Sequence, residues 1–449
     1  MADTDTRRNA SCPCGSGRRY KDCCGRPAPG MAQASWLDAT MQAALAAQQA
    51  GEHEVAHAAY AAVLERMPGL ADALHMYGVA QYAIGDLDGA LASIAEAARR
   101  FGGGFPPARV NLALVVATHL ARLAPPETER QFTRYAEMRA ARVRASHARA
   151  AVRPEGRVSV VVPSHGHAPY VEAALASALE QTRPADEIVV IDDGSSDGSI
   201  ARIRAAESRA GGRIRLVARE RRGAAATINE AIAMSSGDWI AILNSDDRYA
   251  PTRLETMLAR VAGAGAQWGY SRSGLVDAEG LVVPPGTNGR VDGLRALQDG
   301  VGSFDTVGLA FVARNAAITT GALFVSRALL DRVGGFRDLR YTHDWEFCLR
   351  ASLHDEPVYV PEPLYEYRTH GANTIAAPDG SADAEADEML RTFYAGAASA
   401  APSGNPYAPL PSVWGPLFWL RAIEGGNAAL LPAGVVEALA DELLGRIAA

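Results

Sequence analysis

Residues 158–199 read VSVVVPSHGHAPYVEAALASALEQTRPADEIVVIDDGSSDGS. The first five residues, 158–162, are a valine-rich run, as expected of a strand that is buried on both faces of a sheet. Residues 170–181 have helical periodicity, and 187–191 form a second apolar run. A strand, a helix and a strand in this order are typical of a parallel sheet with helices on both faces. We therefore expect a doubly wound α/β domain.

The same alternation continues along the chain. We expect two more strands and two more helices, namely strands at 213–217 and 239–243 and helices at 199–209 and 227–235. In sheets of this kind, ligands bind beyond the carboxyl ends of the strands. This rule points to three polar segments, which are 163–167, 192–197 and 244–247.

The last of these segments carries two adjacent carboxylates, Asp246 and Asp247. Adjacent acids repel each other, and they would be poorly solvated at the end of a buried strand. A divalent cation removes this conflict, because Mg²⁺ or Mn²⁺ is held by a few hard oxygens and completes its shell with substrate phosphates. The pattern therefore predicts a cation that in turn holds a diphosphate.

The composition excludes several classes of protein. The 449 residues include 48% hydrophobic and 21% charged residues, which is typical of a globular chain with several domains. The net charge of -7 is opposite to the basic charge typical of nucleic-acid-binding domains, so no nucleic-acid partner is expected. Lys21 is the only lysine, which excludes a P-loop and a Schiff-base cofactor site in the expected α/β domain.

No targeting or membrane-spanning segment is expected. The N-terminal residues 1–10 are polar and do not resemble a secretory signal. The most apolar stretch outside the expected sheet, 110–124, is too short to cross a bilayer. We predict a cytoplasmic protein, and peripheral attachment at the inner face of the membrane stays open.

Four of the five cysteines lie close together near the N-terminus, and they are Cys12, Cys14, Cys23 and Cys24. In a cytosolic chain, such a cluster more often binds metal than forms disulfides, and four thiolates suit tetrahedral Zn²⁺. The spacing, with Gly-Ser-Gly between the pairs, resembles the SEC-C zinc motif. We expect a structural zinc site without an open position for catalysis. A redox-active or disordered tail is the alternative.

Small and bulky residues recur with a period of 34 between residues 35 and 140. The pairs at this spacing are Gly51 and Gly85, Ala44 and Gly78, Ala56 and Ala90, and Tyr60 and Ile94. The pattern resembles tetratricopeptide repeats, in which small residues let antiparallel helices approach closely. A weaker third repeat is expected at 106–139, and a plain helical bundle is the alternative. The repeats predict a surface for a protein partner or a homodimer.

Residues 157–260 resemble the nucleotide-binding half of a family 2 glycosyltransferase with the GT-A fold. The opening segment quoted above and SGDWIAILNSDDRYAPTRLE, residues 236–255, follow the family's pattern. The resemblance implies a nucleotide-diphospho-sugar donor and Mg²⁺ or Mn²⁺. Asn244 stands where the family often has Asp, and 227–229 read Thr-Ile-Asn where Ala-Arg-Asn is common.

The resemblance also implies the residues that bind the donor and the cation. The donor-binding residues are Pro163, Ser164, His165, Asp192, Asp193, Gly223, Asn229, Ser245, Asp246 and Arg368. The metal ligands are Asp246, Asp247 and His370. Arg368 and His370 lie in PEPLYEYRTHGANTI, residues 361–375, which resembles the family's closing segment.

Residues 318–351 resemble the acceptor segment of the same family. Asp344 matches the position of the catalytic base, and His343 stands where an acid is common. Asp344 begins an amphipathic helix, whose dipole would keep the carboxylate ionised. Trp345 and Glu346 are expected to shape the acceptor pocket.

We predict four parts, which are a SEC-C-like motif at 1–30, helical repeats at 35–140, a GT-A domain at 156–376 and a C-terminal helical extension at 377–449. The predicted function is inverting, metal-dependent transfer of a sugar to a hydroxyl of a glycan, lipid-linked or protein acceptor. The alternative is a catalytically degenerate scaffold that docks partners, and Asn244 and His343 keep it open. Nucleotidyl transfer is a third interpretation.

Overall fold

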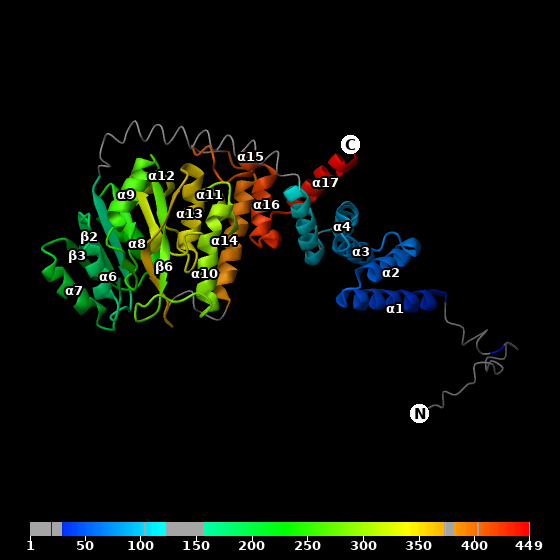
Figure 1. Ribbon diagram of the computed structural model, residues 1–449, viewed down its shortest axis with the longest axis horizontal. Coiled ribbons are helices and arrows are strands. Elements are labelled where there is room, and N and C mark those ends of the chain that lie inside the picture. Colours follow the sequence, from blue (N-terminus) through cyan, green and yellow to red (C-terminus); the bar gives the residue numbers. More distant parts are fainter. Residues whose placement is uncertain are drawn as a thin grey trace, which may run out of the picture. The chain divides into compact units, whose positions relative to one another are not determined.

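The computed structural model describes residues 19, 29–102, 105–122, 156–371, 373, 380–401 and 404–448. They form two compact units (Figure 1). One unit is helical and combines the described residues up to His119 with 433–448, and the other runs from Leu120 to Pro432. The four cysteines of the predicted zinc motif and residues 123–139 of the weaker third repeat lie outside the described residues.

The helical unit consists of α1 (Pro29–Gln49), α2 (His53–Arg66), α3 (Ala71–Ala83), α4 (Leu87–Phe101), most of a helix at 106–122, and α17 (Val435–Ala448). Each of α1 to α3 packs against the next helix. Gly51 and Gly85 occupy the same turn in two successive helix pairs, with φ of 81° and 87°, a conformation that favours glycine. Ala56, Tyr60 and Ile94, which recur at the 34-residue period, are fully buried. The recurring residues are therefore packing positions.

Helix α17 belongs to this helical unit. It packs on α4, and Nη1 of Arg99 lies 3.0 Å from Oδ1 of Asp441. Arg109 and Glu437 form a second ion pair at 3.7 Å. The extension predicted for 377–449 is thus divided between the two units.

The larger unit is built on one eight-stranded sheet with the order β3-β2-β1-β4-β7-β6-β8-β5. The strands are β1 (Val158–Ser164), β2 (Glu187–Asp193), β3 (Ile214–Arg219), β4 (Trp239–Ile242), β5 (Arg248–Tyr249), β6 (Trp268–Val276), β7 (Leu323–Ser326) and β8 (Val358–Arg368). The first four are parallel, as the sequence predicts. β7 runs antiparallel to both β4 and β6, which makes the whole sheet mixed.

Helices surround this sheet (Figure 1). They are α6 (Val171–Leu179), α7 (Ser199–Arg209), α8 (Ala224–Met234), α9 (Arg253–Gly263), α10 (Gly289–Asp299), α11 (Val307–Ala313), α12 (Arg327–Val333), α13 (His343–His354), α14 (Ser381–Ala397), α15 (Pro411–Trp414) and α16 (Pro416–Glu424). Val158, Val160 and Val162 are fully buried in the main core cluster. β1 lies between β2 and β4, so the strand order reverses beside it and the polar ends of β1 and β4 are neighbours.

Helix α14 holds the loop that leads into α13. The carboxylate of Glu385 accepts hydrogen bonds from the backbone N–H groups of Arg340 (2.9 Å), Tyr341 (2.7 Å) and Thr342 (2.8 Å). It also accepts one from Oγ1 of Thr342 at 2.9 Å. A carboxylate at a helix N-terminus satisfies N–H groups that have no partner within the helix and interacts favourably with the helix dipole. Glu385 therefore fixes where α13 begins.

Gly78 offers a test of the helix packing. A Cβ at this position would overlap Cγ1 of Ile94 on α4. We expect Gly78→Ala to destabilise the helical unit by about 1–3 kcal/mol, because the overlap outweighs the gain in helix propensity. Urea unfolding followed by circular dichroism measures this. The matched control is Gly445→Ala on α17, where nothing lies within 4 Å and Ala should stabilise by about 0.5–1 kcal/mol. Equal effects of the two substitutions would contradict the packing.

Glu385 offers a test by pH. Burial by itself would raise the pKa of Glu385, but the hydrogen bonds from Tyr341, Arg340 and Thr342 lower it below its usual 4.5. These bonds therefore stabilise the fold above pH 4.5, and this contribution is lost as the pH falls through the lowered folded pKa. Glu385→Gln should melt below wild type at neutral pH, and the difference should shrink in acid. Glu388→Gln on the same helix is the control, and an unchanged gap at low pH would refute the assignment.

Candidate functional site

Three side chains that can ligate a metal meet beyond the carboxyl ends of β1, β4 and β8. They are His167, Asp246 and His370, here called the strand-end cluster, and their ligand atoms all lie within 4.8 Å of one another. Nε2 of His370 lies 3.1 Å from Oδ2 of Asp246, and Nε2 of His167 lies 3.7 Å from the same oxygen. The sequence predicts Asp246 and His370 as ligands. It does not single out His167, although the strand-end rule marks the segment 163–167 in which it lies.

Neighbouring residues orient the two histidine rings of the cluster. Nδ1 of His167 lies 2.8 Å from Oγ of Ser245, so the opposite ring nitrogen faces Asp246. The ring of Tyr170 lies against that of His370, with centroids 5.0 Å apart. Ser245, predicted to bind the donor, therefore supports a member of the cluster.

Asp246 is almost fully buried, with 9% of its surface exposed. Burial by itself would raise the pKa of Asp246, but the neighbouring imidazoles of His370 and His167 hold it below its usual value. The carboxylate is therefore kept in the ionised form that a metal ion requires.

Asp247, predicted as a metal ligand, is not a member of the strand-end cluster, and its hydrogen bonds are directed mainly to β8. Oδ2 accepts hydrogen bonds from the Tyr365 hydroxyl at 2.6 Å and from Nδ2 of Asn244 at 3.1 Å, and Oδ1 accepts one from the Arg368 backbone N–H at 2.7 Å. Burial and the charge of Asp246 raise the pKa of Asp247 well above its usual value. Through these three hydrogen bonds, Asp247 joins the ends of β4 and β8.

The guanidinium of Arg368 is also engaged within the protein. Nε donates to the carbonyl oxygen of Asp246 at 2.8 Å, and Nη1 donates to that of Ala278 at 2.8 Å. The group lies over the ring of Tyr170, 4.9 Å from its centroid. The structure thus shows Arg368, predicted to contact the diphosphate, bracing the loop that carries Asp246.

The ends of β1 and β2 form a second group of predicted donor residues. Ser164, next to Pro163 at the end of β1, donates to Oδ2 of Asp192 at 3.0 Å. Asp192 also accepts hydrogen bonds from the backbone N–H and the hydroxyl of Ser195. Nδ1 of His165 lies 2.9 Å from the carbonyl oxygen of Asp193. The parallel register, which pairs Ser164 with Asp192, brings these residues together.

Asp193 closes the turn before α8. Its carboxylate accepts the backbone N–H groups of Arg222 and Gly223, both at 2.8 Å, and pairs with Arg219. Burial would raise the pKa of Asp193, but these partners lower it. The side chain of Asn229 does not bond to this turn. Its amide exchanges hydrogen bonds with the backbone of Phe336 at 2.7 and 2.8 Å. Asn229 therefore connects α8 to the turn after α12.

Asp344 lies in the first turn of α13 and is buried. Oδ1 accepts hydrogen bonds from the backbone N–H of Trp345 at 2.7 Å and from Nδ2 of Asn315 at 3.2 Å. Burial raises the pKa of Asp344, although the charge of His343 and these two hydrogen bonds oppose the shift. The sequence predicts that the helix dipole favours the ionised form of this group, and burial acts against that effect. A carboxylate with a raised pKa is a stronger base.

A short segment before β7 bonds both to the loop that follows β4 and to α13. Oγ1 of Thr319 accepts a hydrogen bond from Nδ2 of Asn244 at 3.0 Å, and Oγ1 of Thr320 lies 3.0 Å from Nε2 of His343. Ile318, just before them, has φ of 59°, which is unusual for a β-branched residue and typical of strained functional segments. The sequence does not predict this link, because the residues are distant along the chain.

Asn244 and His343, two residues at which this chain departs from the family's pattern, both take part in this link. Asn244 donates through one amide group to both Asp247 and Thr319, which a carboxylate cannot do. Burial and then the charges of Asp247, Asp246 and Asp344 raise the pKa of Tyr367 on β8.

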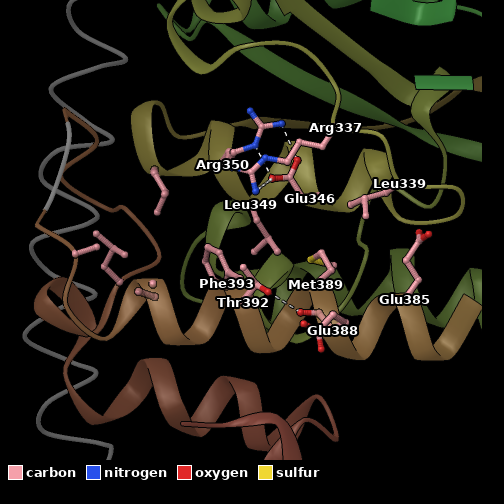
Figure 2. Close-up of a pocket in the computed structure, with 15 residues that line it drawn as sticks. Arg337, Leu339, Glu346, Leu349, Arg350, Glu385, Glu388, Met389, Thr392 and Phe393 are labelled. Atoms are coloured by element: carbon pink, nitrogen blue, oxygen red, sulfur yellow. Dashed lines mark hydrogen bonds and ion pairs between the residues drawn. The ribbon is translucent and has the colours of Figure 1, made fainter. Parts of the chain in front are cut away.

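The side chains of Trp345 and Glu346, which are predicted to shape the acceptor pocket, bond to other groups of the protein. Nε1 of Trp345 donates to the carbonyl oxygen of Phe311 at 2.7 Å. Glu346 is 5% exposed and forms ion pairs with Arg337 at 3.0 Å and Arg350 at 2.6 Å. It lines a cavity of about 380 Å³ between α13 and α14, with apolar side chains such as Met389 on the opposite wall (Figure 2).

Two segments of the chain match the profiles of known families. Residues 159–269 match the glycosyl transferase family 2 profile, and residues 8–26 match the SEC-C motif. The succinoglycan biosynthesis protein ExoO of Rhizobium meliloti is 37% identical over 124 residues, which are 27% of this chain and 35% of that protein. The glucosyltransferase WfgD of Escherichia coli is 31% identical over 126 residues, which are 28% of this chain and 49% of that protein. The chain thus spans about a third to a half of these relatives.

Among solved structures, Staphylococcus aureus TarS 1–349 in complex with UDP-GlcNAc has a TM-score of 0.44 and 18% identity, over 57% of this chain and 71% of that chain. Among the described residues, no helix combines the length and the apolar character needed to cross a membrane. Nearly all of the segment that carries β1 to β4 and Asp246 lies within the match to the glycosyl transferase family 2 profile, and the match to the SEC-C motif precedes it in the same chain.

Proposed function

We propose that residues 156–376 transfer a sugar, with inversion, from a nucleotide-diphosphate donor to an acceptor hydroxyl in a metal-dependent reaction. The observation that carries this proposal is the strand-end cluster at the reversal of the strand order, two members of which, His167 and Asp246, lie in the segment that matches family 2. Such a position is where nucleotides bind in doubly wound sheets. Thr319 bonds to Asn244, two residues before Asp246, and Thr320 bonds to His343, next to Asp344.

The side chains of the cluster fit a divalent cation. They offer two imidazole nitrogens and one ionised carboxylate within 4.8 Å of one another, and Ser245 orients one ring as outer partners of metal ligands do. When bound, the cation would neutralise the charge that develops on the departing diphosphate. Three protein ligands leave coordination positions for phosphate oxygens.

Asp344 is proposed as the general base. Oδ1 is occupied by Trp345 and Asn315, and among the described residues no hydrogen bond is made to Oδ2. Oδ2 would take the proton of the acceptor hydroxyl as its oxygen forms a bond to the anomeric carbon. The bond from that carbon to the diphosphate then breaks on the opposite face, and the nucleoside diphosphate leaves. Burial assists, because it raises the pKa of this carboxyl.

The acceptor is proposed as a hydroxyl of a glycan, which is free, lipid-linked or attached to protein. One relative, WfgD, is named as a UDP-Glc-dependent enzyme that acts on GlcNAc-diphosphoundecaprenol, which supports a lipid-linked glycan. The helical unit is proposed to dock a protein partner or a second copy of the chain.

A structural zinc ion is proposed for the N-terminal motif. The match of residues 8–26 to the SEC-C motif supports it, as do the four thiols of Cys12, Cys14, Cys23 and Cys24. Four thiolates complete a tetrahedral site and leave no position for substrate, so the role is structural.

The donor can be found by thermal shift with a panel of nucleotide-sugars, with and without Mn²⁺. A true donor at 100 times its Kd should stabilise the chain by about 2.7 kcal/mol, and Asp246→Ala should remove the Mn²⁺-dependent part. Slow hydrolysis of that donor should release a nucleoside diphosphate. Release of pyrophosphate would instead indicate nucleotidyl transfer, and binding without any turnover would favour the scaffold.

Replacement of Asp344 separates catalysis from binding. Asp344→Asn keeps the shape of the side chain but cannot accept the proton, so we expect turnover to fall by about 10²–10⁴-fold. Donor stabilisation in the thermal-shift assay should persist. Asp331→Asn, an exposed acid on α12, is the control and should retain wild-type turnover. Full activity of Asp344→Asn would assign the base to another group.

A further inference from the structure

The chemistry of the strand-end cluster is unusual for a site that serves a diphosphate. Two of its three ligand atoms are imidazole nitrogens, from His167 and His370, and one is a carboxylate oxygen of Asp246. The second carboxylate in the neighbourhood, Asp247, is bound by Tyr365 and Asn244. The local donor set is therefore rich in nitrogen.

The orientation of His167 is set by the protein. Nδ1 lies 2.8 Å from Oγ of Ser245, and Nε2 lies 3.7 Å from Oδ2 of Asp246. The side chain of His167 is 22% exposed, and that of Asp246 is 12% exposed. A hydrogen bond from Nδ1–H to Ser245 leaves the lone pair on Nε2, directed at the space that Asp246 borders.

The two histidine rings stand nearly perpendicular to each other. Their planes meet at 85°, and their centroids are 5.9 Å apart. The ring of Tyr170 lies 6.5 Å from that of His167 and 5.0 Å from that of His370, centroid to centroid, and the guanidinium of Arg368 covers Tyr170. The two imidazoles thus approach Asp246 from different directions, as ligands on one face of a coordination sphere do.

We infer that His167 is a direct ligand of the cation, and that the cluster is a two-histidine, one-carboxylate site that selects a first-row transition ion such as Mn²⁺ over Mg²⁺. This inference rests on the proposed function only for the presence of a cation. Mg²⁺ takes oxygen ligands and loses its water reluctantly, whereas imidazole nitrogen favours transition ions. Within that group the affinity should rise from Mn²⁺ to Co²⁺.

The experiment measures metal binding without donor or acceptor. Metal-free full chain is titrated with Mn²⁺, free Mn²⁺ is followed by electron paramagnetic resonance, and Mg²⁺ is added as a competitor. Wild type should bind Mn²⁺ at least about tenfold more tightly than Mg²⁺. His167→Ala should weaken Mn²⁺ binding by about tenfold or more. His167→Asp should narrow the ratio of Mn²⁺ to Mg²⁺ affinity, because a carboxylate oxygen replaces the nitrogen.

His165→Ala is the matched control. His165 lies two residues earlier on the same loop, and its Nδ1 faces the carbonyl oxygen of Asp193 instead of the cluster. It should bind Mn²⁺ as wild type does, and melting curves without metal identify any variant that is unfolded. Wild-type Mn²⁺ affinity in folded His167→Ala, or equal Mn²⁺ and Mg²⁺ affinities in wild type, would overturn the inference.

The experiment distinguishes failure of the proposed metal site from failure of the proposed transferase function. Selective Mn²⁺ binding that depends on His167, in a chain that turns over no nucleotide-sugar, would support the metal site and reject the transferase. Turnover by a chain that binds neither ion would reject the metal site and retain the transferase.

Discussion

The buried carboxylate of Asp247 joins the two halves of the site. It follows β4, yet it receives the hydroxyl of Tyr365 and the backbone N–H of Arg368, both on β8. An ionised or partly ionised carboxyl in such a place is stable only when its oxygens are hydrogen-bonded. These hydrogen bonds bring the end of β8 to the end of β4. His370, two residues beyond Arg368, consequently meets Asp246.

The two adjacent acids therefore have opposite roles. Asp246 faces two histidines, and its pKa is lowered, whereas burial and the charge of its neighbour raise the pKa of Asp247. This separation resolves the repulsion between two adjacent carboxylates without requiring both to bind one cation. It also explains Asn244, whose amide supplies a donor to Asp247 where a third acid would add repulsion.

The acceptor side depends on contacts from farther along the chain. Glu385 on α14 fixes the start of α13, and Thr320 bonds to His343 beside Asp344. The part of the C-terminal extension that belongs to the larger unit thus has a defined task, which is to hold the helix that carries the proposed base. In the helical unit, α17 instead packs on α4.

Short-range patterns in the sequence were sufficient for the parallel strands β1 to β4, since valine-rich runs, helical periods and turn residues are local properties. They also marked the strand ends where Asp246 and Asp192 lie, and the family resemblance supplied Asp344 and His370. The antiparallel β7 between β4 and β6, the place of His167 beside Asp246 and the bonding of Asp247 to β8 came only from the folded chain. Each depends on hydrogen bonds or pairings between residues far apart in sequence, such as Asp247 with Tyr365, and no local pattern encodes which donor a buried carboxylate will meet.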